Sequence, residues 1–158
     1  GEALRPMFLY VYALASGGSA RPADGLRAVD EALMLIEATG ERHSEVELYR
    51  TKGELTLQQE SQRAKVKGQK SKVTDPQPPT PNPQGEAEAC FLKAIEIARK
   101  QQAKSLELRA TMSLARLWQQ QSNQHDAHRM LSDIYHWFTE GFETEDLQDA
   151  KALINSLT

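Results

Sequence analysis

Apolar residues recur along the chain at intervals of three and four, the spacing that gathers them on one face of a helix. Polar residues fill the remaining positions of each stretch. The pattern predicts seven helices, at about 2–16, Pro22–Thr39, 44–59, 86–102, 105–121, 123–141 and 145–157.

Residues at the ends of these stretches are typical helix boundaries. Gly40 is placed to close the second helix. Ser44 with Glu47 forms a capping-box signature for the third helix. Asn123 and Thr144 are expected to cap the sixth and the seventh.

A short motif of a small, an apolar and a small or apolar residue recurs with a spacing of four and then three. The second and third copies lie 40 residues apart, whereas the first and second lie 62 apart. An insertion of 22 residues in the second copy would make every interval 40. The three copies are Gly25, Val29, Ala32; Ala87, Phe91, Ala94; and Ala127, Leu131, Ile134.

The segment 59–85 has the composition expected of that insertion. It has five of the seven prolines and five cations, with Val66 and Val73 as its large aliphatic residues. Such a segment buries too little apolar surface to offset the entropy of ordering it. We therefore predict a Lys/Pro-rich loop at about 60–84, inserted between the two helices of the second repeat.

Composition supports an all-α fold. The chain has 19 Ala and 18 Leu against 5 Val and 5 Ile, a balance that favours helix over sheet. The whole of 1–158 is expected to be one helical-repeat domain, with repeats at about 2–40, 41–102 and 103–141 and a C-terminal capping helix at 144–157. Six large residues are expected in its core: Leu33, Leu48, Phe91, Ile95, Leu117 and Leu131.

Charge and apolar content limit the function classes. The net charge of −3 gives no cationic field for nucleic-acid binding, and the longest apolar run, Met7–Ala15, is about half of the ~20 residues that a membrane span needs. One cysteine, Cys90, excludes an internal disulfide framework. We expect no secretory leader and a cytoplasmic location.

The arrangement of the repeated positions resembles the tetratricopeptide repeat. Tyr49, Gly53, Ala87, Phe91 and Ala94 carry the likeness in the second repeat, although the period of 40 is longer than that family's 34. The resemblance implies three antiparallel helical hairpins stacked side by side. It also implies a groove lined by the first helix of each pair.

A narrower likeness is found in "ELYRTKGEL" (47–55), "EAEACFLKAIEIARKQQAKSLELRATMSLARLW" (86–118) and "WFTEGFETEDLQDAKALI" (137–154). These segments resemble the C-terminal helical-repeat region of large bacterial signalling ATPases, which are often joined to class III adenylate or guanylate cyclase domains. The likeness implies a noncatalytic interaction or regulatory module of a longer protein. The nucleotide-handling motifs of those proteins are not found in this sequence, so no catalytic residue is assigned.

Transferring the groove offsets of the tetratricopeptide repeat gives candidate partner-binding residues. Arginines at three of these positions are suited to gripping a carboxylate of a peptide or a neighbouring domain, and Met112 is suited to an adaptable apolar floor. A merely hydrated polar face is an equal alternative. The candidates are Glu47, Arg50, Glu54, Leu57 and Gln58 in the second repeat, and Arg109, Met112, Arg116, Gln119 and Gln120 in the third.

Other candidate chemistry is weak. Gly17 and Gly18 lack the lysine of a phosphate-binding loop. His125 and His128, with Asp126 between them, have a spacing that suits two metal ligands, but no third ligand is evident, and a small helical metal-dependent hydrolase is the remote alternative. We assign no metal and no cofactor.

Two further segments, one cationic and one apolar, are candidates for contact with a partner. The cations of 63–72 could bind an anionic partner, and the prolines after them could form a polyproline helix, but the composition favours a solvated linker. No aromatic residue is interleaved for base stacking, which argues further against single-strand binding. The first helix is apolar nearly all round, at Met7, Phe8, Tyr10 and Val11, which predicts self-association of the chain. Besides the interaction module, a purely structural spacer between domains fits the same sequence.

Overall fold

The computed structural model describes residues 21–69 and 82–158, and in these ranges it contains six helices and no strand. The all-α prediction is confirmed for this part of the chain. The predicted helix at 2–16, with its apolar face, lies outside the described residues. The helices are α2 (Pro22–Thr39), α3 (Glu45–Gln69), α4 (Pro83–Lys100), α5 (Lys104–Gln120), α6 (Gln124–Tyr135) and α7 (Glu145–Ser156).

The chain divides into two compact units, residues 1–90 and 91–158. The boundary falls within α4, between Cys90 and Phe91.

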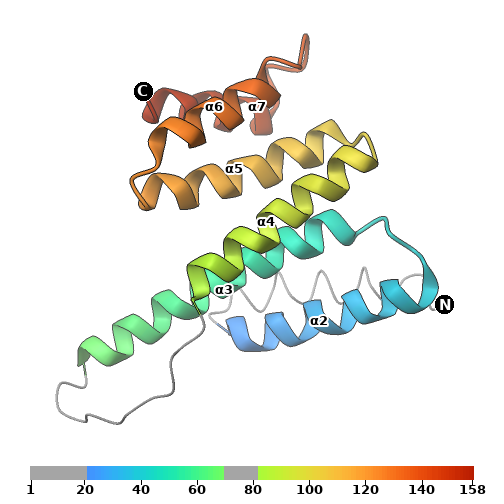
Figure 1. Cartoon of the computed structure of the whole chain (residues 1–158), viewed down its shortest axis with the longest axis vertical. Helices are drawn as coiled ribbons and strands as arrows, with labels where there is room; N and C mark the ends of the chain where they lie inside the picture. The colour runs from blue at the N-terminus through green and yellow to red at the C-terminus, as the bar shows by residue number, and fades with distance from the viewer. Residues whose placement is uncertain (1–20, 70–81) are drawn as a thin grey trace. The chain divides into compact units, whose positions relative to one another are not determined.

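In the first unit, α2 and α3 lie side by side in opposite directions (Figure 1). The bounds of α2 agree with the prediction, and Gly40 ends it in the left-handed conformation, with φ of 76°. The N–H of Gly40 donates to the carbonyl of Ile36 at 2.8 Å, so it satisfies one of the last helical acceptors. The short connection that follows turns the chain back antiparallel.

A small apolar core joins these two helices. The α2 face repeats at helical spacing and packs on two leucines of α3. Leu33, predicted in the core, is only partly buried and packs at the edge of this cluster. The core consists of Ala28, Val29, Ala32, Ile36, Leu48 and Leu55.

Helix α3 ends ten residues later than predicted, so the first ten residues of the loop expected at about 60–84 are helical instead. Residues 60–69 are helical, and α4 begins at Pro83. The segment Glu60–Gln69 is rich in Gln, Lys, Arg and Ala and contains no proline, so helix propensity extends α3 past the core. The low hydrophobicity of this segment indicated correctly that the side chains at 63–66 are exposed. The loop predicted from it was wrong here, because the backbone stays helical.

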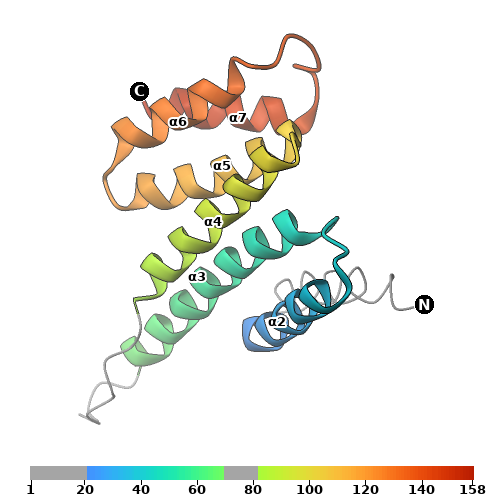
Figure 2. The ribbon, with the colours of Figure 1, turned by 45° about the vertical axis from the view of Figure 1, so that its right-hand side comes forward.

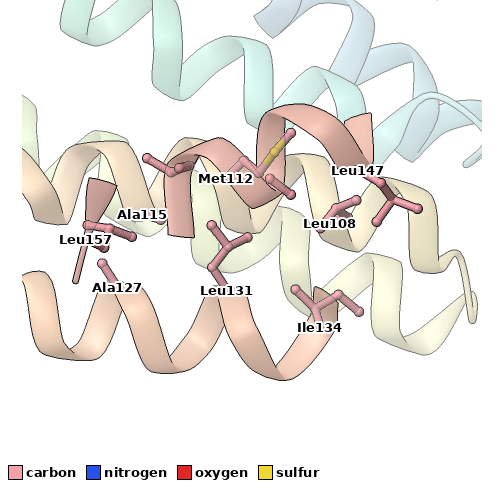
Figure 3. Packing of buried hydrophobic residues seen from close by; sticks show 10 residues of the cluster. Leu108, Met112, Ala115, Ala127, Leu131, Ile134, Leu147 and Leu157 are labelled. Carbon is pink, nitrogen blue, oxygen red and sulfur yellow. The ribbon is translucent and has the colours of Figure 1, made fainter. Parts of the chain in front are cut away.

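In the second unit, α6 lies antiparallel to α5, and α7 packs on both (Figure 2). Their apolar side chains form one cluster. Figure 3 shows Ala127, Leu131 and Ile134 pointing from α6 toward side chains of α5 and α7. The cluster also contains Leu108, Met112, Ala115, Leu147, Ala150, Leu153 and Leu157.

The positions of the repeated motif are buried in all three copies. The apolar residues Val29, Phe91 and Leu131 have no exposed surface. The small residues that accompany them, Gly25, Ala32, Ala87, Ala94 and Ala127, are buried as well, and so is Ile134. Two pairs of consecutive helices, α2 with α3 and α5 with α6, are packed together; α5 with α6 is the hairpin predicted for the third repeat.

The end of α6 and the caps of α6 and α7 differ from the sequence expectation. Helix α6 stops at Tyr135 rather than near Gly141, because the run of ring and β-branched residues 136–139 has poor helix propensity. Asn123 and Thr144 precede α6 and α7 as predicted, but neither side chain makes a capping hydrogen bond. The hydroxyl of Thr144 instead donates to the carbonyl of Gly141 at 2.6 Å.

Candidate partner-binding surfaces

The α3 candidates form a polar row in which Arg50 is the centre. Its Nε and Nη2 donate to Oε1 and Oε2 of Glu47 at 3.0 and 2.8 Å, and its Nη1 donates to Oε1 of Glu54 at 2.9 Å. Glu47 and Glu54 precede and follow Arg50 by three and four residues, so all three side chains lie on one helix face. The Arg50 side chain is 17% exposed, whereas that of Glu54 is 44% exposed.

This geometry changes the role expected of Arg50. A guanidinium that is bound by two carboxylates of its own helix is not a vacant receptor for a third one. The bidentate pair with Glu47 fixes the orientation of the guanidinium. Leu57, half-buried, continues the surface by one turn. The sequence therefore located a polar face, but the charged groups of Glu47, Arg50 and Glu54 on that face are already paired with one another.

The α5 candidates meet a different neighbour, the C-terminal helix. Nε of Arg109 donates to Oδ2 of Asp146 at 2.8 Å, and Nε2 of Gln119 donates to Oγ of Ser156 at 3.2 Å. These two bonds tie the first and last turns of α7 to one face of α5. The predicted groove face of the third repeat is thus the surface on which α7 packs.

Met112 lies between these two bonds and is 5% exposed. It belongs to the hydrophobic cluster with Leu147 and Leu153 of α7, so it is a core residue and not the floor of an open groove. Arg116 remains exposed, as does Gln120. The sequence predicted a capping helix, but helical periodicity does not tell which face such a helix covers.

A buried carboxylate that sequence reasoning missed lies at the start of α5. Glu107 is 4% exposed, and its two oxygens accept from Nε of Arg99 at 2.8 Å and from Nζ of Lys104 at 3.2 Å. Lys104 also lies 5.6 Å from the centre of the Trp137 ring. The three-residue spacing of Lys104 and Glu107 was a readable signal, whereas the link to Arg99 depends on the turn between α4 and α5.

In the first unit, Cys90 lies near a second charged pair. Nζ of Lys52 is 2.9 Å from Oδ1 of Asp30 on α2. Burial lowers the pKa of Lys52, but its hydrogen bond and charge interaction with Asp30 outweigh burial, so the pKa is raised. Burial also raises the pKa of the Cys90 thiol, and the Lys52 charge only partly opposes this. A thiol with a raised pKa holds less reactive thiolate, which fits the interpretation of Cys90 as a packing residue.

The histidine pair on α6 shows no ligand geometry. His125 is exposed, and Asp126 lies 3.5 Å from Nη2 of Arg129. No group of three His, Cys, Asp or Glu side chains suited to a metal ion occurs within 21–69 and 82–158. None of the helices described for this chain combines the length and the apolar content of a membrane span.

Comparison with known proteins adds no relative: no family model, no curated protein and no solved structure matches the chain.

Proposed function

We propose that this chain is a noncatalytic protein–protein interaction or regulatory module, and that it forms the C-terminal part of a cytoplasmic bacterial signal-transduction ATPase or cyclase. The parent class rests on the resemblance of the three sequence segments quoted above. The proposed mechanism is docking of a peptide or neighbouring domain on tetratricopeptide-like hairpins, which changes what the attached enzyme does.

The observation that carries the proposal is the fixed polar row on α3. Arg50 is held in place by three hydrogen bonds to Glu47 and Glu54 before any partner arrives. A surface whose long side chains are already ordered loses less conformational entropy when it binds. Ion pairs at this spacing also stabilise a helix on their own, so the binding test below is what separates the interaction module from a spacer.

The test is a pull-down with the chain as bait, in which the charge of the candidate arginines is reversed. The chain with Arg50→Glu, Arg109→Glu and Arg116→Glu is compared with wild type against the domains encoded upstream in the same reading frame. A matched control reverses Arg27, Arg129 and Lys151, which are exposed and lie outside the candidate set. Circular dichroism verifies that both variants remain helical.

An interaction module requires that the candidate variant lose the partner while the control variant retains it. Equal recovery of the upstream domains by all three proteins would support the structural spacer instead. The upstream reading frame tests the parent class separately, since a Walker-type ATPase or a cyclase motif is expected there.

A further inference from the structure

The turn between α6 and α7 exposes large aromatic side chains that the core does not use. Trp137 is 57% exposed and Phe142 is 43% exposed. Each of these rings packs against a neighbouring ring. The ring centres of Phe142 and Tyr135 are 5.8 Å apart, and those of Trp137 and Phe138 are 5.2 Å apart in an edge-on arrangement. Exposed aromatic rings held in a fixed arrangement are typical of interface residues.

The segment that carries these rings is acidic, and Lys104, the cation at Trp137, is bound to the buried Glu107. From 133 to 149 the sequence contains six carboxylates and no lysine or arginine. Asp146 is paired with Arg109, but Glu140 and Glu143 are exposed and form no ion pair within the described residues. A partner for this aromatic turn must therefore supply cations together with an apolar anchor.

A surface of that chemistry lies on the chain itself, at the exposed end of α3. Arg63, Lys65 and Val66 are all exposed, and Val66, at 54%, is a large aliphatic residue without a core to enter. No acidic residue lies between Glu60 and Asp75. The two surfaces thus have opposite charge, and each carries an exposed apolar residue.

We propose that the aromatic turn of one copy docks on the cationic end of α3 of a second copy, so that the chain self-associates head to tail. Charge attraction brings the two surfaces together, and Trp137 and Phe142 cover Val66. This contact uses neither the polar row of α3 nor the apolar segment predicted to be helical at 2–16. It goes beyond the proposed function, so either idea can fail without the other.

The proposal predicts association that weakens with salt. Exposed charges are screened over about 8–10 Å at physiological ionic strength, so the dissociation constant should rise about tenfold or more between about 20 and 500 mM NaCl. Sedimentation equilibrium of the full chain measures it. Association through the apolar residues of 2–16 predicts the opposite, because burial of apolar surface is not weakened by salt.

Two charge-reversal variants make the test specific. The first carries Glu140→Lys and Glu143→Lys, and the second carries Arg63→Glu and Lys65→Glu; each alone should associate more weakly than wild type, because like charges then face each other at these four positions. Mixed together, they are again complementary and should associate as wild type does. Trp137→Ala should weaken association of the wild type, while the control Glu37→Lys with Glu41→Lys should not.

A wild-type chain that stays monomeric at low salt overturns the proposal, and so does a mixture of the two reversed variants that remains monomeric. Association that both reversed variants retain would show that another surface joins the copies. Circular dichroism of each variant separates loss of association from loss of fold.

Discussion

Gln102 and Ser122 hold the same rare backbone conformation at the ends of consecutive helices. Their φ angles are 55° and 64°, in the left-handed region that favours glycine. In both cases the next residue closes the turn: the N–H of Ala103 donates to the carbonyl of Ala98 at 2.9 Å, and that of Asn123 to Trp118 at 2.8 Å. The turns from α4 to α5 and from α5 to α6 are thus built alike.

This shared turn predicts a stabilising substitution. A residue with a Cβ is strained in the left-handed region, so Gln102→Gly and Ser122→Gly should each raise the free energy of unfolding by about 0.5–1 kcal/mol. Gln101→Gly is the matched control, because Gln101 has no positive φ and should gain nothing. Urea unfolding followed by circular dichroism measures the difference, and an equal effect at 101 and 102 would contradict the strain argument.

Two methionines test the position of α7 on α5. Met112 is 5% exposed within the cluster of the second unit, whereas Met34 on α2 is 72% exposed. Met112→Ala should lower the free energy of unfolding by about 2–5 kcal/mol because it leaves a cavity, and Met34→Ala by less than about 0.5 kcal/mol. If Met112→Ala unfolds at the wild-type urea midpoint, Met112 instead faces solvent and the groove of the third repeat is open.

The buried carboxylate of Glu107 should matter more than an exposed one. Glu107→Ala removes hydrogen bonds from both Arg99 and Lys104 and should cost about 1–3 kcal/mol of unfolding free energy. Glu96 on α4 accepts from Lys100 at 3.0 Å but lies at the surface. Glu96→Ala should leave the urea midpoint unchanged, and a larger effect at 96 than at 107 would contradict the assigned burial.

The thiol of Cys90 gives a prediction with a pH dependence. Its pKa is raised from the ordinary 9.0 by burial, so the folded chain binds the thiol proton more tightly than the unfolded chain. The resulting stabilisation is complete below the ordinary thiol pKa and is lost as the pH rises through the raised value. Cys90→Ser should flatten this part of the stability curve above pH 9, measured by urea unfolding from pH 7 upward.

The same shift predicts slow alkylation. At neutral pH the native thiol should react with iodoacetamide several-fold more slowly than the thiol of the urea-unfolded chain, because less thiolate is present and access is limited. Faster reaction in the native state would show an activated cysteine.

Local signals predicted the elements better than their ends. Gly40 after an apolar-periodic stretch placed the end of α2 correctly, since a left-handed residue is a local requirement. The end of α3 was missed, because hydrophobic periodicity indicates where a helix packs and not how far an unpacked helix continues. The residue types of Asn123 and Thr144 located the starts of α6 and α7. The hydroxyl of Thr144, however, donates to the carbonyl of Gly141 in the preceding turn and not to its helix.

The candidate surface was predictable only as a set of positions. Spacing placed Glu47, Arg50 and Glu54 on one face, and the structure shows them bonded to one another. No pattern in the sequence indicated that Arg109 and Gln119 would be engaged by α7, since that contact joins residues 37 apart. Such contacts depend on how the side chains of the whole hydrophobic cluster of α5, α6 and α7 fit together, and a local sequence pattern does not contain that information.

The most direct test of the repeated-hairpin account is a comparison of three alanine substitutions. Ala87 and Ala127 hold the same position of the motif and have no exposed surface, whereas Ala89, two residues along α4, is exposed. If both alanines fill equivalent buried positions of repeated hairpins, Ala87→Leu and Ala127→Leu should each lose about 1–3 kcal/mol of unfolding free energy through overpacking. Ala89→Leu should keep the wild-type urea midpoint. Wild-type stability of both Ala87→Leu and Ala127→Leu would contradict the account.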